Sequence, residues 1–552
     1  MMETLLKQTI GQMLEEKAKQ YGDQEAIVYP ERNLRYTYQH FFDETTKVAK
    51  ALLSLGVKKG EHVAVWATNV PEWLTLQFAT ARIGAVLVTV NTNYQSSELE
   101  YLLKQSDSTT LFLIDGFKGT SYVDTVKSLV KAADWISEGK SHIERLPFLK
   151  HLIFIGENPQ DELMSWEEFI SLSADSTDDE LKETEISLDP HEVINMQYTS
   201  GTTGFPKGVM LTHSNILNNG NMIAHAMKLT NEDRLCIPVP FFHCFGCVLG
   251  TLAAFSVGAT IVPLVEFNPE AVLKVVETEK CTALHGVPTM FIAELNLSNF
   301  KEYDLSTLRT GIMAGSPCPI EVMKKVMNEM GMDEITIAYG QTESSPVITQ
   351  TRTDDPIERK VNTVGKSLPE VEVKITDPIT GKEVPRNNPG ELCTRGYHVM
   401  KGYYKMPDAT NEAIDEDGWL HTGDLAMMDE EGYVQITGRL KDMIIRGGEN
   451  VYPREIEEFL YTHPDVLDVQ VIGVPDEKYG ERVAACIQKK EGSTLTEEEL
   501  LSYCKGKIAK YKIPEYIFFV DEYPMTASGK IQKYKLRKQA ESWLEEKQKT
   551  VN

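Results

Sequence analysis

Residues 198–209 read Tyr198-Thr199-Ser200-Gly201-Thr202-Thr203-Gly204-Phe205-Pro206-Lys207-Gly208-Val209. This stretch holds four Ser/Thr hydroxyls, three glycines and one lysine between hydrophobic flanks. Glycines let backbone N–H groups approach a ligand closely, and a series of such groups forms an anion-binding concavity. The hydroxyls add neutral donors, and Lys207 adds a positive charge for phosphate. The stretch therefore predicts a loop that binds a polyphosphate.

The loop is not a Walker A loop, whose pattern is G-x-x-x-x-G-K-[ST]. Counting from Gly201, Pro206 stands where the second glycine belongs, and Gly208 follows Lys207 in place of Ser or Thr. Composition alone also fits a polar surface loop without a ligand. The choice between the two therefore depends on motifs elsewhere in the chain.

Length and charge narrow the classes of protein. A chain of 552 residues is expected to form several domains. A hydrophobic share of 41% with 25% charged residues is typical of a soluble globular protein. The net charge of −26 disfavours nucleic acid and anionic membrane as partners, because both require a basic face. It does not exclude a locally positive ATP site.

Three features bear on the cellular compartment. The first 17 residues are charged and lack the apolar core of a secretory signal. Residues 245–264 are uncharged and long enough to span a bilayer, but their glycines, threonines and proline favour a buried helix followed by a strand. The eight cysteines show no secreted-type framework, and Cys244-x-x-Cys247 lacks a second pair, which disfavours zinc or redox chemistry there. We therefore expect a cytoplasmic protein without a transmembrane segment.

Alternating apolar runs and helical patterns predict an α/β fold. Strands are expected at residues 62–66, 85–90 and 110–114, and a helix begun by proline at residues 71–82. This alternation predicts parallel-rich sheets flanked by helices. The acidic, Ser/Thr-rich residues 171–189 are expected to be a solvated linker.

A domain boundary is expected just after Gly438. Before it, residues 432–437 resemble a strand. After it come a short strand at 443–445, a helix at 453–461 and an apolar strand at 468–474, followed by a charged C-terminal helix. We therefore predict a large N-terminal domain, residues 1–438, and a small α+β domain, residues 439–552.

Further motifs follow the glycine-rich stretch. In chain order they are Pro240-Phe241-Phe242-His243, Ala338-Tyr339-Gly340-Gln341-Thr342-Glu343, Gly418-Trp419-Leu420-His421-Thr422-Gly423-Asp424, Gly438-Arg439-Leu440-Lys441-Asp442, Arg446-Gly447-Gly448-Glu449-Asn450 and Pro524-Met525-Thr526-Ala527-Ser528-Gly529-Lys530. Each is weak alone, but their order and spacing together are specific. Over nearly the whole chain the set resembles the acyl-adenylate-forming superfamily, which includes acyl-CoA synthetases, firefly luciferase and peptide-synthetase adenylation domains. Residues 446–453 and 525–530 resemble fatty acyl-CoA synthetases most, particularly medium-chain ones.

The resemblance implies an ATP-dependent ligation of a carboxylic acid to coenzyme A. The acid oxygen attacks the α-phosphate of ATP to give an acyl-AMP and pyrophosphate, and a thiol then displaces AMP. Such chemistry depends on positioning and charge stabilisation. The resemblance also implies that the small C-terminal domain is a mobile lid.

The same resemblance assigns roles to individual residues. The β- and γ-phosphates are expected to bind at Thr199, Ser200, Gly201, Thr202, Thr203, Gly204, Phe205, Pro206 and Lys207. The rest of the ATP site is expected to comprise Gly315, Ser316, Tyr339, Gly340 and Gln341 at the adenine, Thr342 at the α-phosphate, Asp424 and Arg439 at the ribose, and Lys530 between the acid and the α-phosphate. Glu343 is the expected Mg²⁺ ligand, because carboxylate and phosphate oxygens suit this ion.

CoA and the acyl group are expected to use other residues. By resemblance His243 is a gate between the acyl pocket and the thiol entry, Gly448 borders the CoA tunnel, and Lys441 is the hinge of the lid. The acyl pocket is expected to be lined by Phe241, Phe245, Gly286, Val287, Pro288 and Met313. An apolar lining is common in ligand pockets and does not define a chain length.

Several alternatives stay open at this point. Asp424 could cap a helix, Arg439 could form a domain-interface salt bridge, His243 could be a core histidine, and Glu343 and Lys530 could be solvated. The function could instead be loading of a carrier protein, acetoacetyl- or aromatic acyl-CoA ligation, a luciferase-like oxidation, or nucleotide sensing without catalysis. A homodimer is also left open.

Overall fold

The computed structural model describes residues 5–130, 145–158, 160–199, 206–316, 318–446, 449–476, 478–505, 507–525 and 531–551. The predictions for Ser200, Gly201, Thr202, Thr203, Gly204, Phe205, Gly448 and Lys530 lie outside these residues.

The larger of the two main sheets has nine strands, and its central strands are parallel. In spatial order they are β18 (Lys366–Ser367), β17 (Val347–Gln350), β16 (Glu334–Gly340), β15 (Thr310–Met313), β14 (Ala283–Gly286), β12 (Arg234–Ile237), β13 (Thr260–Pro263), β1 (Glu25–Tyr29) and β2 (Leu34–Thr37).

The second main sheet has eight strands. Their order is β21 (Gly402–Tyr403), β11 (Lys207–Thr212), β10 (Val193–Thr199), β4 (Val86–Thr89), β3 (His62–Trp66), β5 (Thr110–Leu113), β8 (His151–Phe154) and β9 (Met164–Ser165). The strands from β10 to β9 pair in parallel, whereas β11 and β21 pair antiparallel at one edge. The parallel-rich sheets of the predicted fold class are thus confirmed.

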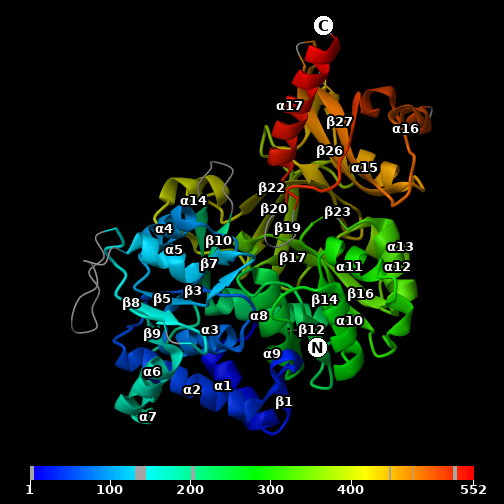
Figure 1. The fold of residues 1–552 in the computed structure, drawn as a ribbon. Coiled ribbons are helices and arrows are strands. Elements are labelled where there is room, and N and C mark those ends of the chain that lie inside the picture. Colours follow the sequence, from blue (N-terminus) through cyan, green and yellow to red (C-terminus); the bar gives the residue numbers. More distant parts are fainter. Residues whose placement is uncertain are drawn as a thin grey trace.

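Two helices pack in the middle of the molecule, among the strands of both main sheets (Figure 1). They are α3 (Pro71–Ile83) and α8 (His213–Ala226), and nearly all of their residues are buried. A helix that is buried on all sides needs no polar face, which explains the apolar and small residues around α3. The core residues of the larger sheet, of one face of the second sheet and of both helices form one continuous cluster. The other face of the second sheet packs against α4 (Ser96–Gln105) and α5 (Tyr122–Leu129) in a separate cluster.

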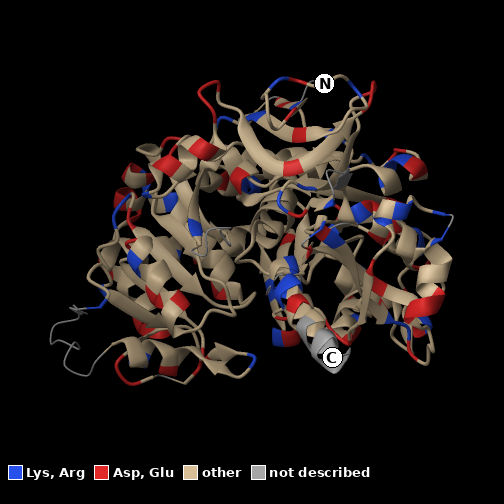
Figure 2. Cartoon of the chain, turned by 90° about the horizontal axis from the view of Figure 1, so that it is seen from above, with Lys and Arg blue, Asp and Glu red and all other residues tan. Residues whose placement is uncertain are grey.

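The remaining helices of the body cover the outer faces and edges of these sheets (Figure 1). They include α1 (Ile10–Tyr21), α2 (Tyr38–Ser54), α4 (Ser96–Gln105), α5 (Tyr122–Leu129), α6 (Trp166–Ser171), α10 (Pro269–Glu279), α11 (Pro288–Leu295), α12 (Ile320–Met330), α13 (Ile357–Asn362) and α14 (Pro407–Ala413). Acidic residues are distributed over the whole molecule rather than gathered in one part of it (Figure 2).

The uncharged residues 245–264 fold as a buried helix followed by a strand, as predicted. A π-helical segment, η4 (Phe245–Leu252), continues into α9 (Ala253–Val257), and Gly258 ends the helix in the left-handed conformation before β13. Within the described residues, none of the helices is long and apolar enough to cross a membrane.

The prediction of a solvated linker at residues 171–189 is wrong. Most of this segment is helical: η3 (Leu172–Asp175) is followed by α7 (Asp178–Ile186). Thr177 caps α7 in a capping box with Glu180. Acidic residues in the first turn interact favourably with the positive end of the helix dipole. The buried Leu181 and the ion pair between Glu185 and the buried Arg82 attach α7 to the body.

Beyond the main sheets, a smaller sheet precedes the C-terminal unit. Its strands are β19 (Val371–Thr376), β20 (Gly390–Gly396), β22 (Leu420–Met428) and β23 (Val434–Arg439). The C-terminal unit stands above the body in Figure 1. It contains β24 (Ile444–Arg446), β25 (Glu449–Val451), β26 (Val466–Asp476), β27 (Gly480–Lys489), β28 (Tyr516–Phe519), α15 (Pro453–Tyr461), α16 (Glu497–Cys504) and α17 (Lys533–Val551).

The chain passes from one sheet to the next between Arg439 and Ile444. The C-terminal unit has hydrophobic clusters of its own, separate from the core of the body. These observations are compatible with the predicted domain division after residue 438, which stays a prediction.

Candidate active site

The glycine-rich stretch begins and ends on paired strands. Thr199, the last residue of β10, is the antiparallel partner of Lys207, the first residue of β11. The two ends of the stretch are therefore held side by side, which is the geometry of a loop closed by a hairpin. The Tyr101 hydroxyl donates a hydrogen bond to the Pro206 carbonyl oxygen over 3.1 Å and ties the end of the stretch to α4.

Tyr403 joins Lys207 to Glu343. The Lys207 ammonium lies 4.7 Å from the centre of the Tyr403 ring, within cation–π range. The Tyr403 hydroxyl donates to Oε1 of Glu343 over 2.8 Å. Burial, with the Glu343 charge as a second cause, raises the pKa of Tyr403, so its hydroxyl keeps the proton that it donates. Three segments distant in sequence thus meet at one tyrosine on β21, beside β11.

Tyr339, Asp424 and Arg439 form a second group. The Tyr339 hydroxyl donates to Oδ2 of Asp424 over 2.7 Å, and Arg439 Nε donates to Oδ1 over 3.1 Å. Asp424 and Arg439 are cross-strand partners on β22 and β23. Burial and the Asp424 charge raise the pKa of Tyr339. Asp424 lies within a strand, so the structure excludes the helix-cap alternative.

The segment from Tyr339 to Glu343 connects these two groups. It leaves β16 at Gly340, where an added Cβ would lie 1.8 Å from the Pro346 carbonyl oxygen, so a side chain cannot be accommodated. The buried Thr342 then opens a short 3₁₀ turn, η6 (Thr342–Ser344). The Ser344 hydroxyl accepts from the Gln341 N–H and fixes the turn. One short segment therefore places Tyr339 at Asp424 and Glu343 at Tyr403.

Gly315 and Ser316 follow one residue after the end of β15, the neighbour of β16 in the sheet. Gly315 has a φ of +91°, which favours glycine at this turn. The two residues therefore lie after one strand, and Tyr339–Gln341 lie at the end of the adjacent parallel strand. Such an edge, at the carboxyl ends of parallel strands, is where ligands bind in open α/β sheets.

Glu343 suits a hard cation. Its carboxylate is half-buried and accepts one hydrogen bond at Oε1 from Tyr403. A carboxylate has about four lone-pair positions, so capacity remains for a metal ion. The donor chemistry therefore fits the predicted Mg²⁺.

His243 caps the helix that begins beside it. Its Nδ1 accepts from the Phe245 N–H over 3.2 Å, and its carbonyl oxygen accepts from the N–H groups of Gly246 and Cys247. The side chain is half-buried, so His243 is not a core histidine enclosed on all sides.

The predicted acyl-pocket residues gather around the π-helical segment. Phe241, Phe245, Val287 and Met313 are all buried. The buried His285 connects two of their elements, because its Nε2 donates to the Leu249 carbonyl oxygen in η4 and its Nδ1 accepts from Ile312 in β15. Burial lowers the pKa of His285 to about 4, so it is neutral at physiological pH. π-helical segments are frequent at functional sites.

The predicted hinge lies in a tight turn. Lys441 is exposed and lies between Arg439 and β24, the first strand of the C-terminal unit. The Arg439 carbonyl oxygen accepts hydrogen bonds from the N–H groups of Asp442 and Met443. The turn contributes few buried contacts, as a hinge requires.

Sequence reasoning missed two residues of this site. Tyr403 belongs to the aromatic run Gly402-Tyr403-Tyr404, which carries no phosphate-binding pattern. Glu391 on β20 accepts the Gly423 N–H at Oε1 over 3.0 Å and so holds the residue before Asp424. Only the pairing of distant strands reveals either role.

Comparison with known proteins identifies the family. The family model "AMP-binding enzyme" matches residues 14–404, and the model "AMP-binding enzyme C-terminal domain" matches residues 455–530. The chain belongs to the AMP-binding enzyme family. The predicted boundary at residue 438 falls between the two matched ranges of this AMP-binding enzyme.

Named relatives of the AMP-binding enzyme are acyl-CoA synthetases. A Bacillus subtilis (strain 168) protein named "Putative acyl-CoA synthetase YngI" is 63% identical over 97% of this chain and 98% of its own length. The "Medium-chain acyl-CoA ligase ACSF2, mitochondrial" of Bos taurus is 43% identical over 98% of this chain and 89% of its own. The enzyme is therefore an AMP-forming acyl-CoA synthetase, with ATP and CoA as substrates.

Solved structures share the whole fold. ATP-bound MatB from Rhodopseudomonas palustris has a TM-score of 0.84 at 28% identity, over 97% of this chain and 99% of that one. The anthranilate CoA ligase AuaEII in complex with anthranoyl-AMP has a TM-score of 0.85 at 27% identity, over 98% and 99%. The predicted architecture, a large N-terminal domain with a smaller C-terminal one, is thereby confirmed.

Proposed function

We propose that this enzyme activates a medium-chain fatty acid, with ATP bound along the Tyr339–Glu343 segment. The observation that carries the binding mode is the double anchorage of this segment. Tyr339 contacts Asp424 at one end, and Glu343 contacts Tyr403 beside Lys207 at the other. A nucleoside triphosphate has its nucleoside at one end and its outer phosphates at the other, and it matches this arrangement.

At the first end, Asp424 binds the ribose. Its carboxylate is nearly buried and is held by Tyr339 and Arg439, so it is fixed before ATP arrives. Both of its oxygens act as hydrogen-bond acceptors here, and acceptor oxygens of this kind suit the hydroxyl groups of a ribose. Preorganisation of this kind reduces the entropy that binding costs.

At the second end, Lys207 and the backbone of the glycine-rich stretch bind the β- and γ-phosphates. Glu343 holds Mg²⁺, which when bound neutralises charge on the phosphate oxygens. Tyr403 fixes the Glu343 carboxylate through its hydroxyl. Thr342, one residue before Glu343, is then placed at the α-phosphate.

The reaction has two steps. A carboxylate oxygen of the acid forms a bond to the α-phosphorus as the bond to the bridging oxygen breaks, and pyrophosphate leaves. The CoA thiolate then attacks the acyl carbon, and AMP leaves with the electrons of the C–O bond. In the first step Lys530 is placed between the two anions, where its charge lowers their repulsion.

The acid is proposed to be a medium-chain one on two grounds. The pocket residues Phe241, Phe245, Val287 and Met313 are apolar and buried, and a relative covering nearly the whole chain is named a medium-chain acyl-CoA ligase. A neighbouring structure is an anthranilate CoA ligase, so aromatic acids belong in the test.

The test is a series of straight-chain acids from acetate to palmitate, with acetoacetate and benzoate added. Each buried methylene contributes about 0.8 kcal/mol, so kcat/KM should rise about fourfold per carbon until the pocket is full and then fall. A maximum at medium length supports the proposal. A maximum at acetoacetate, benzoate or palmitate contradicts the proposed acid, and a requirement for a carrier protein in place of CoA contradicts the proposed acceptor.

A further inference from the structure

Glu391, Cys393 and His421 form a compact cluster, of which only Glu391 has a part in the ATP site described above, through its hydrogen bond to the Gly423 N–H. Cys393 on β20 and His421 on β22 are cross-strand partners, and Glu391 lies two residues before Cys393 on the same face of β20. Among the residues that the structure describes, this is the one group of three or more His, Cys, Asp and Glu side chains whose ligand atoms all lie within 4.8 Å of one another.

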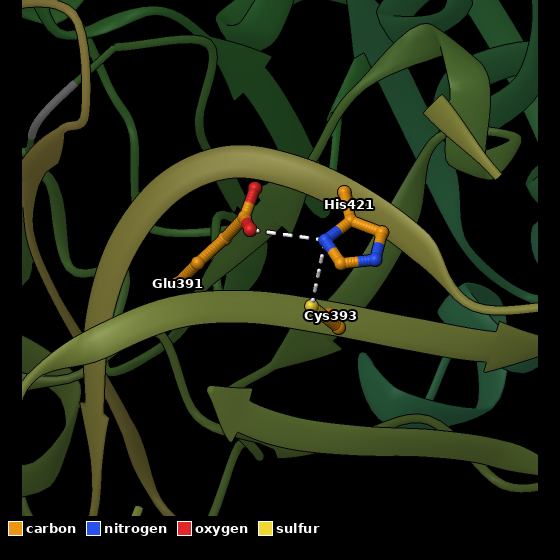
Figure 3. Close-up of side chains that lie close together, drawn as sticks. All are labelled: Glu391, Cys393 and His421. Atoms are coloured by element: carbon orange, nitrogen blue, oxygen red, sulfur yellow. Dashed lines mark hydrogen bonds and ion pairs between the residues drawn. The ribbon is translucent and has the colours of Figure 1, made fainter. Parts of the chain in front are cut away.

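All three side chains point toward a common centre (Figure 3). His421 Nδ1 lies 3.0 Å from Glu391 Oε2 and 3.4 Å from Cys393 Sγ. One ring nitrogen has a single proton or a single lone pair, so it cannot hydrogen-bond fully to both neighbours. A cation between the three atoms would satisfy all of them at once.

The N–O and N–S separations at His421 are close to those of tetrahedral coordination. Zinc binds thiolate sulfur at about 2.3 Å and imidazole nitrogen or carboxylate oxygen at about 2.0–2.1 Å, which places the N and S ligands about 3.5 Å apart and the N and O ligands about 3.3 Å apart. The observed separations of 3.4 and 3.0 Å differ from these by a few tenths of an ångström.

The surroundings of the cluster also suit a metal ion. A histidine that ligates a metal commonly has a carboxylate at its other ring nitrogen. Asp415 Oδ2 lies 3.5 Å from His421 Nε2, in that position. Cys393 is fully buried and Glu391 nearly so, whereas the His421 side chain is 32% exposed, which gives an ion a route from solvent.

We propose that Glu391, Cys393 and His421 form a binding site for a borderline divalent cation, with Zn²⁺ the ion that fits this N, O and S donor set. Water completes the coordination on the exposed side. On binding, the Cys393 sulfur forms a bond to the metal and its proton leaves to solvent. The ion is distinct from the Mg²⁺ of ATP, because Mg²⁺ prefers oxygen ligands alone.

The site adjoins the ribose-binding group. Glu391 binds the ion through Oε2 while Oε1 keeps its hydrogen bond to the Gly423 N–H. Gly423 has a φ of +69° and directly precedes Asp424. An occupied site therefore fixes the turn that carries Asp424, and metal binding is expected to stabilise the native fold by mass action.

Co²⁺ tests the proposal, because thiolate coordination gives a charge-transfer absorption in the near ultraviolet. The full-length enzyme, purified with chelator and reductant and then dialysed, is titrated with Co²⁺ alone and, separately, with Zn²⁺ during thermal unfolding. We expect one Co²⁺ per chain with this band, and a rise in Tm with Zn²⁺. Cys393→Ser should lose the band and weaken Co²⁺ binding at least tenfold, whereas Cys504→Ser, at another buried cysteine, should keep both.

Cys393→Ala is measured in parallel, so that a folding defect in one variant does not decide the result. A wild-type enzyme without the band at saturating Co²⁺ would overturn the proposal. So would a band that survives both Cys393 variants, since the thiolate ligand would then lie elsewhere.

Discussion

At the scale of single residues, Tyr403 is the contact on which the phosphate end of the site depends. We predict that Tyr403→Phe lowers kcat/KM for ATP about tenfold, because a hydrogen bond to a charged group contributes about 1.5–3 kcal/mol. The neighbouring Tyr404 provides the control, since its hydroxyl donates to Asp107 over 3.0 Å instead. Pyrophosphate exchange measures the first step. Equal losses in Tyr403→Phe and Tyr404→Phe would show a packing effect and not the positioning of Glu343.

Glu343 itself gives a second prediction at this scale. Glu343→Gln keeps the shape and removes the charge, so the Mg²⁺ concentration for half-maximal adenylation should rise at least tenfold. The Tyr403 hydroxyl can still donate to the amide oxygen, so the fold and Tm should change little. An unchanged Mg²⁺ requirement would assign Glu343 a purely structural role.

At the scale of elements, we propose that the C-terminal unit rotates at the turn of residues 439–443 between the two half-reactions. Proline at 441 fixes φ near −65° and restricts the rotation of the C-terminal unit. We predict that Lys441→Pro lowers thioester formation from isolated acyl-AMP at least tenfold while pyrophosphate exchange stays within about twofold. Lys441→Ala, which leaves the backbone free, should preserve both. Equal rates for the proline variant in both assays would place the hinge elsewhere.

The elements themselves were predictable where the local pattern is strong. β3 and α3 lie within a residue of their predicted bounds, and residues 245–264 form the predicted helix and strand. The helix α7 was not predictable, because it buries a single residue, Leu181, and so shows almost no apolar periodicity. The order of the motifs along the sequence was enough to predict Tyr339, Glu343 and Asp424 as site residues. It could not locate Tyr403, because the contact to Glu343 joins residues 60 positions apart through the pairing of β11 and β21.

At the scale of the whole molecule, three fully buried histidines make stability depend on pH. Burial lowers the pKa of His213 and His398 to about 3 and of His285 to about 4. In the unfolded chain these groups take up protons near pH 6.5, so below that pH the unfolded state binds more protons than the native state. Their contribution to the free energy of unfolding is therefore complete above pH 6.5 and decreases on acidification, by about 1.4 kcal/mol per pH unit for each histidine.

His285→Gln isolates one of these contributions. Urea unfolding at pH 7, 6 and 5 should show a slope smaller than that of the wild type by about 1.4 kcal/mol per pH unit between pH 6 and 5. The comparison with the wild type removes the opposite effect of buried carboxyls such as Glu294, whose pKa is raised by burial. Replacement of the exposed His191 by Gln should leave the slope unchanged. Identical slopes for the wild type and His285→Gln would contradict a neutral His285 in the native state.

The proposed function requires that ATP lies along the Tyr339–Glu343 segment, with the ribose at Asp424 and the outer phosphates near Lys207, Tyr403 and Glu343. Calorimetric titration with MgATP and with AMP tests this most directly. Asp424→Asn should weaken the binding of both nucleotides about tenfold or more, because both contain the ribose. Glu343→Gln should weaken the binding of MgATP by a similar factor and leave the affinity for AMP within about twofold of the wild-type value. Undiminished AMP binding by Asp424→Asn would contradict this binding mode. Equal losses of affinity for AMP and MgATP in Glu343→Gln would contradict it as well.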